Sequence, residues 1–150
     1  MLIKYRKDKD MSKTAIIYWS GTGNTEMMAN AIAEGAESVG AEVSVMTCDS
    51  FEQGMIADFD YIAFGCPAMG AEMLEDTEFE PMFSACETAL RGKKIALFGS
   101  YGWGDGEWMR TWEERVKDDG AELFCSGLTV NNTPDAAALE ECRKLGAMLA

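Results

Sequence analysis

A short polar stretch, Ser20-Gly21-Thr22-Gly23-Asn24-Thr25, has the residue types of an anion-binding loop. It follows an apolar run at residues 14–19 and precedes apolar residues with helical spacing at positions 29, 32, 33 and 36. This pattern predicts a strand, a tight loop and the start of a helix. The first N–H groups of a helix lack internal partners, and the helix dipole adds positive charge there. Two glycines and four side chains with donor groups complete a predicted anion site.

The absence of certain residues from this loop excludes two classes of phosphate-containing ligand. A dinucleotide-binding loop needs a third glycine where Glu26 stands. A nucleoside-triphosphate loop needs a lysine, and none lies between Thr14 and Gly40, nor does any arginine. The loop therefore favours a phosphate monoester held by hydroxyl and backbone N–H groups. The alternative is a polar strand-to-helix turn that binds nothing.

Two further loops have the composition expected around a flat aromatic ring. Residues 65–72 follow the apolar run Tyr61–Gly65, and residues 100–106 follow the apolar run Lys94–Gly99. Trp103 could stack on a ring and Met69 offers a polarisable thioether. The glycines on both sides of Trp103 leave N–H groups available for a ring carbonyl. The alternative is that both side chains belong to the protein core.

Apolar runs alternate with helical patterns along the chain, which predicts an α/β fold with a three-layer, five-stranded parallel sheet. Pro81 is expected at the first position of a helix, and Thr133-Pro134-Asp135 at the opening of the last one. We expect the acidic segment 49–60 to be a loop. The expected strands are residues 14–19, 42–47, 61–65, 94–99 and a strand within 122–130.

Residues 19–26 closely resemble the FMN-phosphate loop of short-chain flavodoxins, especially the clostridial kind, and the two other loops match that family as well. The resemblance extends from about Lys13 to the C-terminus. It implies the flavodoxin strand order 2-1-3-4-5, with FMN at the carboxyl ends of the strands; flavodoxin is itself the standard example of this arrangement. Residues 13–150 are expected to form the FMN-binding domain and residues 1–12 a disordered extension.

The resemblance also implies which residues bind FMN and how. Met69 would cover the inner face of the flavin and Trp103 its outer face. The carbonyl of Gly70 would accept a hydrogen bond from the reduced ring, and Glu72 would bind the N3 edge. The full cofactor-binding set is Ser20, Gly21, Thr22, Gly23, Asn24, Thr25, Pro67, Ala68, Met69, Gly70, Ala71, Glu72, Ser100, Tyr101, Gly102, Trp103, Gly104 and Asp105.

Two residues depart from the clostridial pattern. Ala71 stands where relatives often have Asp or Asn, and Pro67 stands where Ser is common. Alanine tolerates a positive φ poorly, at a cost of roughly 1–2 kcal/mol. We therefore expect any positive φ in this pair to fall on Gly70 and not on Ala71.

The function implied by the resemblance is low-potential one-electron transfer, with non-covalent FMN passing between oxidised, semiquinone and hydroquinone states. No catalytic residue is assigned, and the protein is expected not to be an enzyme. An FMN-dependent NAD(P)H:quinone or flavin reductase of the same fold is the main alternative. A phospho-receiver domain is rejected, because Ser20-Gly21 and Gly65-Cys66 stand where its aspartates are needed. A cofactor-free interaction domain is the least favoured alternative.

Composition limits the partners. The chain of 150 residues has a formal net charge of −13 and no histidine, which argues against nucleic acid and anionic membranes. It suits redox partners, a reductase and acceptor enzymes, that have basic docking faces. The odd number of cysteines, five without a Cys-x-x-Cys pair, argues against a disulfide framework or a metal site. We expect a cytoplasmic monomer with no membrane span and no signal peptide.

Overall fold

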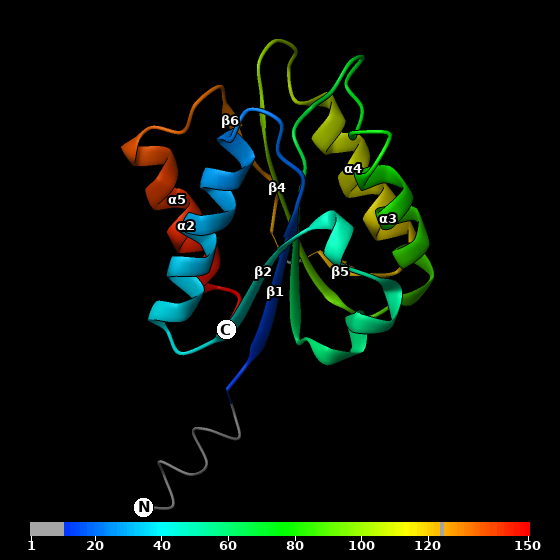
Figure 1. The fold of residues 1–150 in the computed structure, drawn as a ribbon, viewed down its shortest axis with the longest axis vertical. Coiled ribbons are helices and arrows are strands. Elements are labelled where there is room, and N and C mark those ends of the chain that lie inside the picture. Colours follow the sequence, from blue (N-terminus) through cyan, green and yellow to red (C-terminus); the bar gives the residue numbers. More distant parts are fainter. Residues whose placement is uncertain (1–10, 124) are drawn as a thin grey trace, which may run out of the picture.

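A parallel sheet forms the middle layer of the protein in a computed structural model that describes residues 11–123 and 125–150 (Figure 1). Its strands lie in the order β2-β1-β3-β4-β5, and β6 also pairs with β4. All of these pairings are parallel. The predicted three-layer α/β fold and strand order are confirmed. The strands are β1 (Lys13–Tyr18), β2 (Glu42–Thr47), β3 (Tyr61–Gly65), β4 (Lys94–Tyr101), β5 (Glu122–Leu123) and β6 (Leu128–Asn131).

The last edge of the sheet differs from the expected single strand within residues 122–130. β5 pairs with the first residues of β4, and β6 pairs with residues 98–101 at its other end. Between them, the N–H of Gly127 donates to Glu113 Oε2 at 2.6 Å instead of to β4. The described part of this edge consists of two short strands, β5 and β6.

Two pairs of helices cover the two faces of the sheet (Figure 1). α2 (Asn24–Ser38) and α5 (Ala136–Ala147) lie on one face, and α3 (Phe79–Cys86) and α4 (Glu107–Asp118) on the other. The segment expected as an acidic loop instead contains two short 3₁₀ helices, Cys48–Ser50 and Gln53–Asp58, and a third follows α3 at Glu87–Ala89.

The starts of α3 and α5 can be compared with the helix starts expected from the sequence. Pro81 is the third residue of α3, not the first; proline is tolerated at both places, because the first N–H groups of a helix have no internal acceptor. The helix expected to open at Thr133-Pro134-Asp135 begins at Ala136; Asp135 caps it, and its side chain accepts a hydrogen bond from Ala138 N at 2.8 Å.

Alternation along the strands divides the core into two parts. In β1, Ala15 and Ile17 face the α3–α4 side, whereas Ile16 and Tyr18 face the α2–α5 side. The α3–α4 side is rich in aromatic rings, which meet edge to face at centroid distances of 5.1–5.7 Å: Phe64, Phe79, Phe83 and Trp112. Such pairs add roughly 0.5–1.5 kcal/mol each to the burial of apolar area.

The predicted disordered extension covers residues 1–12, of which residues 1–10 lie outside the described part of the chain. Ser12 already joins the fold, because its carbonyl accepts a hydrogen bond from Glu42 N at 2.8 Å. None of the helices formed by residues 11–123 and 125–150 is long and apolar enough to cross a membrane.

Two glycines allow α2 and α5 to pack closely. A Cβ at Gly35 would overlap the carbonyl oxygen of Arg143, and a Cβ at Gly146 would overlap that of Ile32. Both obstacles are backbone atoms of the opposite helix, which cannot move without shifting that helix. The spacing of the two helices therefore depends on the absence of side chains at these positions.

We predict that Gly35→Ala lowers the free energy of unfolding by about 1–3 kcal/mol, because the added methyl group overpacks the α2–α5 contact. Urea unfolding followed by circular dichroism measures the change. Gly54→Ala is the matched control, since a Cβ there meets nothing within 4 Å. An equal loss of stability in both variants would contradict the close packing.

Candidate functional site

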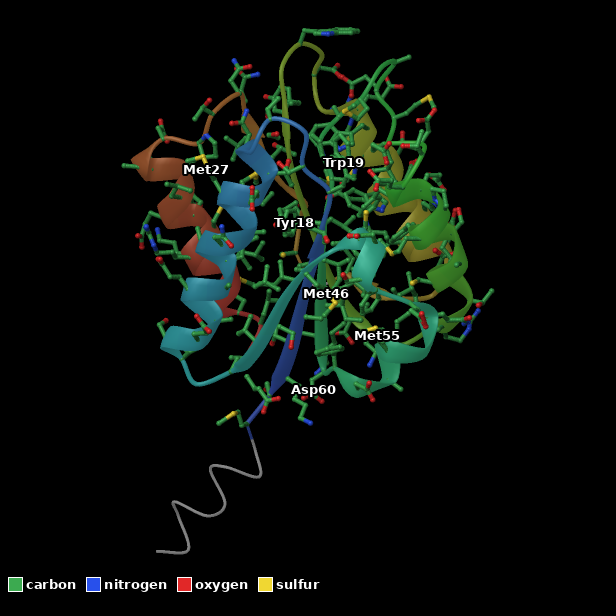
Figure 2. The ribbon with its side chains drawn as sticks, in the orientation of Figure 1. Tyr18, Trp19, Met27, Met46, Met55 and Asp60 are labelled. Atoms are coloured by element: carbon green, nitrogen blue, oxygen red, sulfur yellow. The ribbon has the colours of Figure 1, made fainter. Side chains whose placement is uncertain are left out.

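The carboxyl ends of β1, β3 and β4 lie at one end of the sheet, and three loops extend from them above the sheet (Figure 1). Figure 2 shows Tyr18 and Trp19 towards this end of β1 and Asp60 at the opposite end of the sheet. A cavity of about 250 Å³ opens between the loops. It is lined by Trp19, Gly21, Thr22, Asn24, Pro67, Ala68, Met69, Ser100, Tyr101, Gly102 and Asn132. The three loops identified in the sequence therefore surround one cavity.

The first loop leads into the N-terminus of α2. Gly23 has a φ of 97°, a left-handed conformation that glycine adopts readily. Within the loop, Ser20 Oγ accepts hydrogen bonds from the N–H groups of Gly23 at 3.1 Å and Glu26 at 3.3 Å. Ser20 thus fixes the loop from within.

Several N–H groups of this loop remain available for a ligand. Among the described residues, none accepts a hydrogen bond from the N–H of Gly21, Thr22 or Thr25. These donors surround the start of a helix, where the dipole adds partial positive charge. The loop contains no basic side chain. The donor set therefore fits a phosphate monoester, as the composition of the loop predicts.

A buried pair of hydroxyl groups connects the first loop to β4. Thr25 Oγ1 and Ser100 Oγ are 3.2 Å apart, and the N–H of Ser100 donates to Thr25 Oγ1 at 3.4 Å. Both residues are at most 5% exposed. Thr25 therefore contributes its side chain to the alignment of two loops.

The second loop contains a closed turn. Met69 and Met73 exchange two backbone hydrogen bonds of 2.8 and 2.9 Å. Within the turn, Gly70 has a φ of 51° and Glu72 a φ of 59°, whereas Ala71 has no positive φ. The positive φ falls on Gly70 and not on Ala71, as predicted; the left-handed conformation of Glu72 was not foreseen.

The main-chain and indole N–H groups of Trp108 both hold the second loop. Trp108 N donates to Glu72 Oε2 at 2.8 Å, and its indole Nε1 donates to the Cys66 carbonyl at 3.1 Å. Glu72 therefore places one carboxylate oxygen at the first turn of α4, where negative charge is favourable. Its other oxygen lies so close to Gly104 that a Cβ there would overlap it. The expected contact of Glu72 with the N3 edge of the ring stays a prediction.

The third loop presents its tryptophan to solvent. Trp103 is 77% exposed, so it is not a core side chain. Asn131, at the end of β6, donates through Nδ2 to the carbonyl of Gly102 at 2.9 Å. It also accepts a hydrogen bond from Asn132 Nδ2 at 3.0 Å. These bonds fix the residue immediately before Trp103.

Half of the predicted cofactor-binding residues line the cavity, and the other half do not. Nine of them line the cavity, and two further lining residues, Trp19 and Asn132, were missed. Trp19 directly precedes the first loop, a position that could have suggested it. Asn132 gave no local signal, because the pairing of β6 with β4 brings it to the site. The predicted residues outside the lining are Ser20, Gly23, Thr25, Gly70, Ala71, Glu72, Trp103, Gly104 and Asp105.

Glu75 fixes the far end of the second loop to α3. Burial alone would raise the pKa of this carboxyl group, but hydrogen bonds from the Thr77 hydroxyl and from the backbone N–H groups of Phe79, Glu78 and Thr77 outweigh it and lower the pKa to about 2. At the other end of the loop, burial raises the pKa of the Cys66 thiol. Cys66 is therefore a neutral, buried packing residue.

Comparison with known proteins finds relatives that match most of the chain, including the three loops around the cavity. A family model described as Flavodoxin matches residues 16–146. A flavodoxin of Megasphaera elsdenii is 48% identical over 131 residues, which cover 87% of this chain and 93% of that protein. A flavodoxin of Clostridium beijerinckii is 45% identical over 135 residues, covering 90% and 97%. The solution structure of the two-electron reduced M. elsdenii protein superimposes with a TM-score of 0.83 at 47% identity, covering 89% and 96%.

We predict that the protein loses roughly 2–3 kcal/mol of stability as the pH falls from about 4.5 towards 2 because Glu75 becomes protonated. The pKa of this group is lower in the folded state than in the unfolded state, so its contribution is complete above the unfolded pKa and disappears below the folded one. Urea unfolding as a function of pH measures it. In Glu75→Gln this part of the acid dependence should be absent; an unchanged pH profile would contradict the role of Glu75.

Proposed function

The chain belongs to the flavodoxin family, and we propose that it shuttles single electrons at low potential with FMN held non-covalently between its three loops. Members of this family are FMN-binding electron carriers, so the protein is an electron-transfer protein and not an enzyme. We propose that the cofactor-binding set named above, extended by Trp19 and Asn132, holds the FMN.

The proposal that FMN binds here rests on two kinds of surface that lie next to each other. Unpartnered N–H groups at the N-terminus of α2 lie beside a cavity with walls formed by Pro67, Ala68, Met69 and Tyr101. Phosphate and a flat apolar ring need these two kinds of surface side by side. The first loop would bind the phosphate, and the second and third loops would enclose the ring.

When bound, FMN supplies the capacity to take up and release electrons one at a time; the protein determines how strongly each is held. Gly70 already has the left-handed conformation in a turn closed by Met69 and Met73. Its carbonyl would accept the hydrogen bond of a protonated ring nitrogen, with a net value of about 1 kcal/mol. This acceptor would favour uptake of the first electron together with a proton.

The charges around the site oppose the second electron. Among residues 11–123 and 125–150, none of those that line the cavity is basic, and the whole chain carries a formal charge of −13. A carboxylate about 10 Å from the added charge, at an effective dielectric of about 40, costs roughly 0.8 kcal/mol. For one electron this is about 35 mV for each carboxylate. Several carboxylates together would make the second step strongly reducing.

The rest of the site supports a carrier more than a reductase. A nicotinamide-dependent reductase usually binds the phosphates of its second substrate with Arg or His, and the chain has no histidine and no basic residue in the cavity lining. We propose that a reductase and acceptor enzymes with basic faces dock at the acidic surface around the site. We also propose a cytoplasmic monomer whose binding domain spans residues 13–150.

We predict two separate one-electron steps in an anaerobic reductive titration monitored by visible absorption, with the second step at the lower potential. The cofactor released by denaturation should have the mass of FMN. A single two-electron step, combined with turnover of NAD(P)H, would contradict the carrier and favour the reductase. No flavin in the purified protein, even after addition of FMN, would contradict the site itself.

A further inference from the structure

A second hollow lies on the α3–α4 side of the molecule, next to the second loop. It has a volume of about 180 Å³ and is lined by residues of the segment 72–76, of α3 and of α4. We call it the α4 groove. Its lining residues are Glu72, Met73, Leu74, Asp76, Glu80, Trp108, Thr111, Trp112 and Arg115.

The floor of the α4 groove is apolar and rigid. Trp108 and Trp112, at most 2% exposed, belong to the core together with Leu74. Met73 is 55% exposed and forms a flexible part of the wall. Within residues 11–123 and 125–150, the buried Trp112 Nε1 has no hydrogen-bond acceptor. Burying an N–H group without an acceptor costs roughly 1–3 kcal/mol.

The rim of the α4 groove is negatively charged. Three carboxylates, those of Glu72, Asp76 and Glu80, face a single cation, Arg115. The Arg115 guanidinium is already bound by Glu80 at 2.6 Å and by Glu87 at 2.7 Å. Since this cation is neutralised within the protein, the rim presents net negative charge to anything that approaches.

The α4 groove is continuous with the FMN site. Glu72 and Met73 belong to the turn that begins at Met69, and Glu72 also binds the first turn of α4. A partner seated in the groove would therefore touch the loop next to the ring. The hollow of about 180 Å³ has room for one large side chain.

We propose that the α4 groove is the docking site that anchors a redox partner protein through one apolar side chain flanked by lysine or arginine. The apolar side chain fills the space over Trp108 and Trp112, and a flanking cation pairs with Asp76, while the other rim carboxylates add attraction at longer range. Buried anchors surrounded by a charged rim are the usual source of affinity and specificity in such interfaces. The inference rests on the proposed carrier function, because it assigns a position to the partner of that function.

The test uses the FMN-loaded oxidised protein labelled with ¹⁵N and the blocked tripeptide acetyl-Lys-Phe-Lys-amide as the probe. We expect saturable shifts of the Trp108 and Trp112 indole N–H resonances, with a dissociation constant in the millimolar range. Acetyl-Lys-Ala-Lys-amide, which keeps the cations but lacks the anchor, should leave these two resonances unchanged. The same shifts with both peptides, or no saturable shift with either, would overturn the proposal.

Two variants, each with a control, distinguish the contribution of the apolar side chain from that of the rim carboxylates. Thr111→Trp fills the α4 groove from its exposed wall and should abolish the indole shifts, whereas Ala137→Trp, at an exposed position of α5, should not. Asp76→Lys should weaken binding about fivefold through lost pairing and added repulsion. Glu37→Lys, with the same change of charge on α2, should leave it within about twofold. Equal weakening by Asp76→Lys and Glu37→Lys would overturn the proposal, because only overall charge would then matter.

This experiment can fail separately from the proposed function. Peptide binding is measured without any electron transfer, and the two one-electron steps are measured without any peptide. A protein with two such steps but no peptide shift in the α4 groove would remain a carrier whose partners dock elsewhere.

Discussion

The site depends on two hydrogen bonds that Trp108 donates from the start of α4. One reaches the Cys66 carbonyl where the second loop begins, and the other reaches the Glu72 carboxylate where its turn closes. The same helix is linked to the third loop, because its first turn directly follows residue 106. Backbone bonds from Cys66 and Ala68 to β4 and the carboxylate of Glu75 hold other parts of this loop, but the two bonds of Trp108 join it to α4. They convert two flexible connections into walls with a fixed spacing.

The close spacing of strands beneath the loops has a simple steric basis. A Cβ at Gly99 would overlap the Cys66 carbonyl, and a Cβ at Gly65 would overlap the ring of Phe98. Both glycines lie at or near the ends of neighbouring strands. Their lack of side chains lets the second loop pass close to β4 and places the cavity directly above the sheet. Most of the cavity wall is apolar, and none of the described residues that line it carries a charge.

The sequence was sufficient where the information is local. The helix signal after Thr25, the helix opening at Thr133-Pro134-Asp135 and the runs of apolar residues all predict elements that the structure contains. The places where the sequence was insufficient involve contacts between distant segments. Asn132 reaches the cavity only because β6 pairs with β4, and the carboxylate of Glu72 caps a helix that begins 35 residues later in the chain. The hydrogen bond of Gly127 likewise depends on Glu113 of another element.

We propose that backbone N–H groups at the start of α2 bind the phosphate of FMN without help from a basic side chain. Isothermal titration of the apoprotein with FMN and with riboflavin, which has the same ring but no phosphate, tests it most directly. We predict that FMN binds at least about 100-fold more tightly, because hydrogen bonds to a charged group contribute roughly 1.5–3 kcal/mol each. Equal affinities for FMN and riboflavin would show that the first loop does not bind the phosphate of FMN.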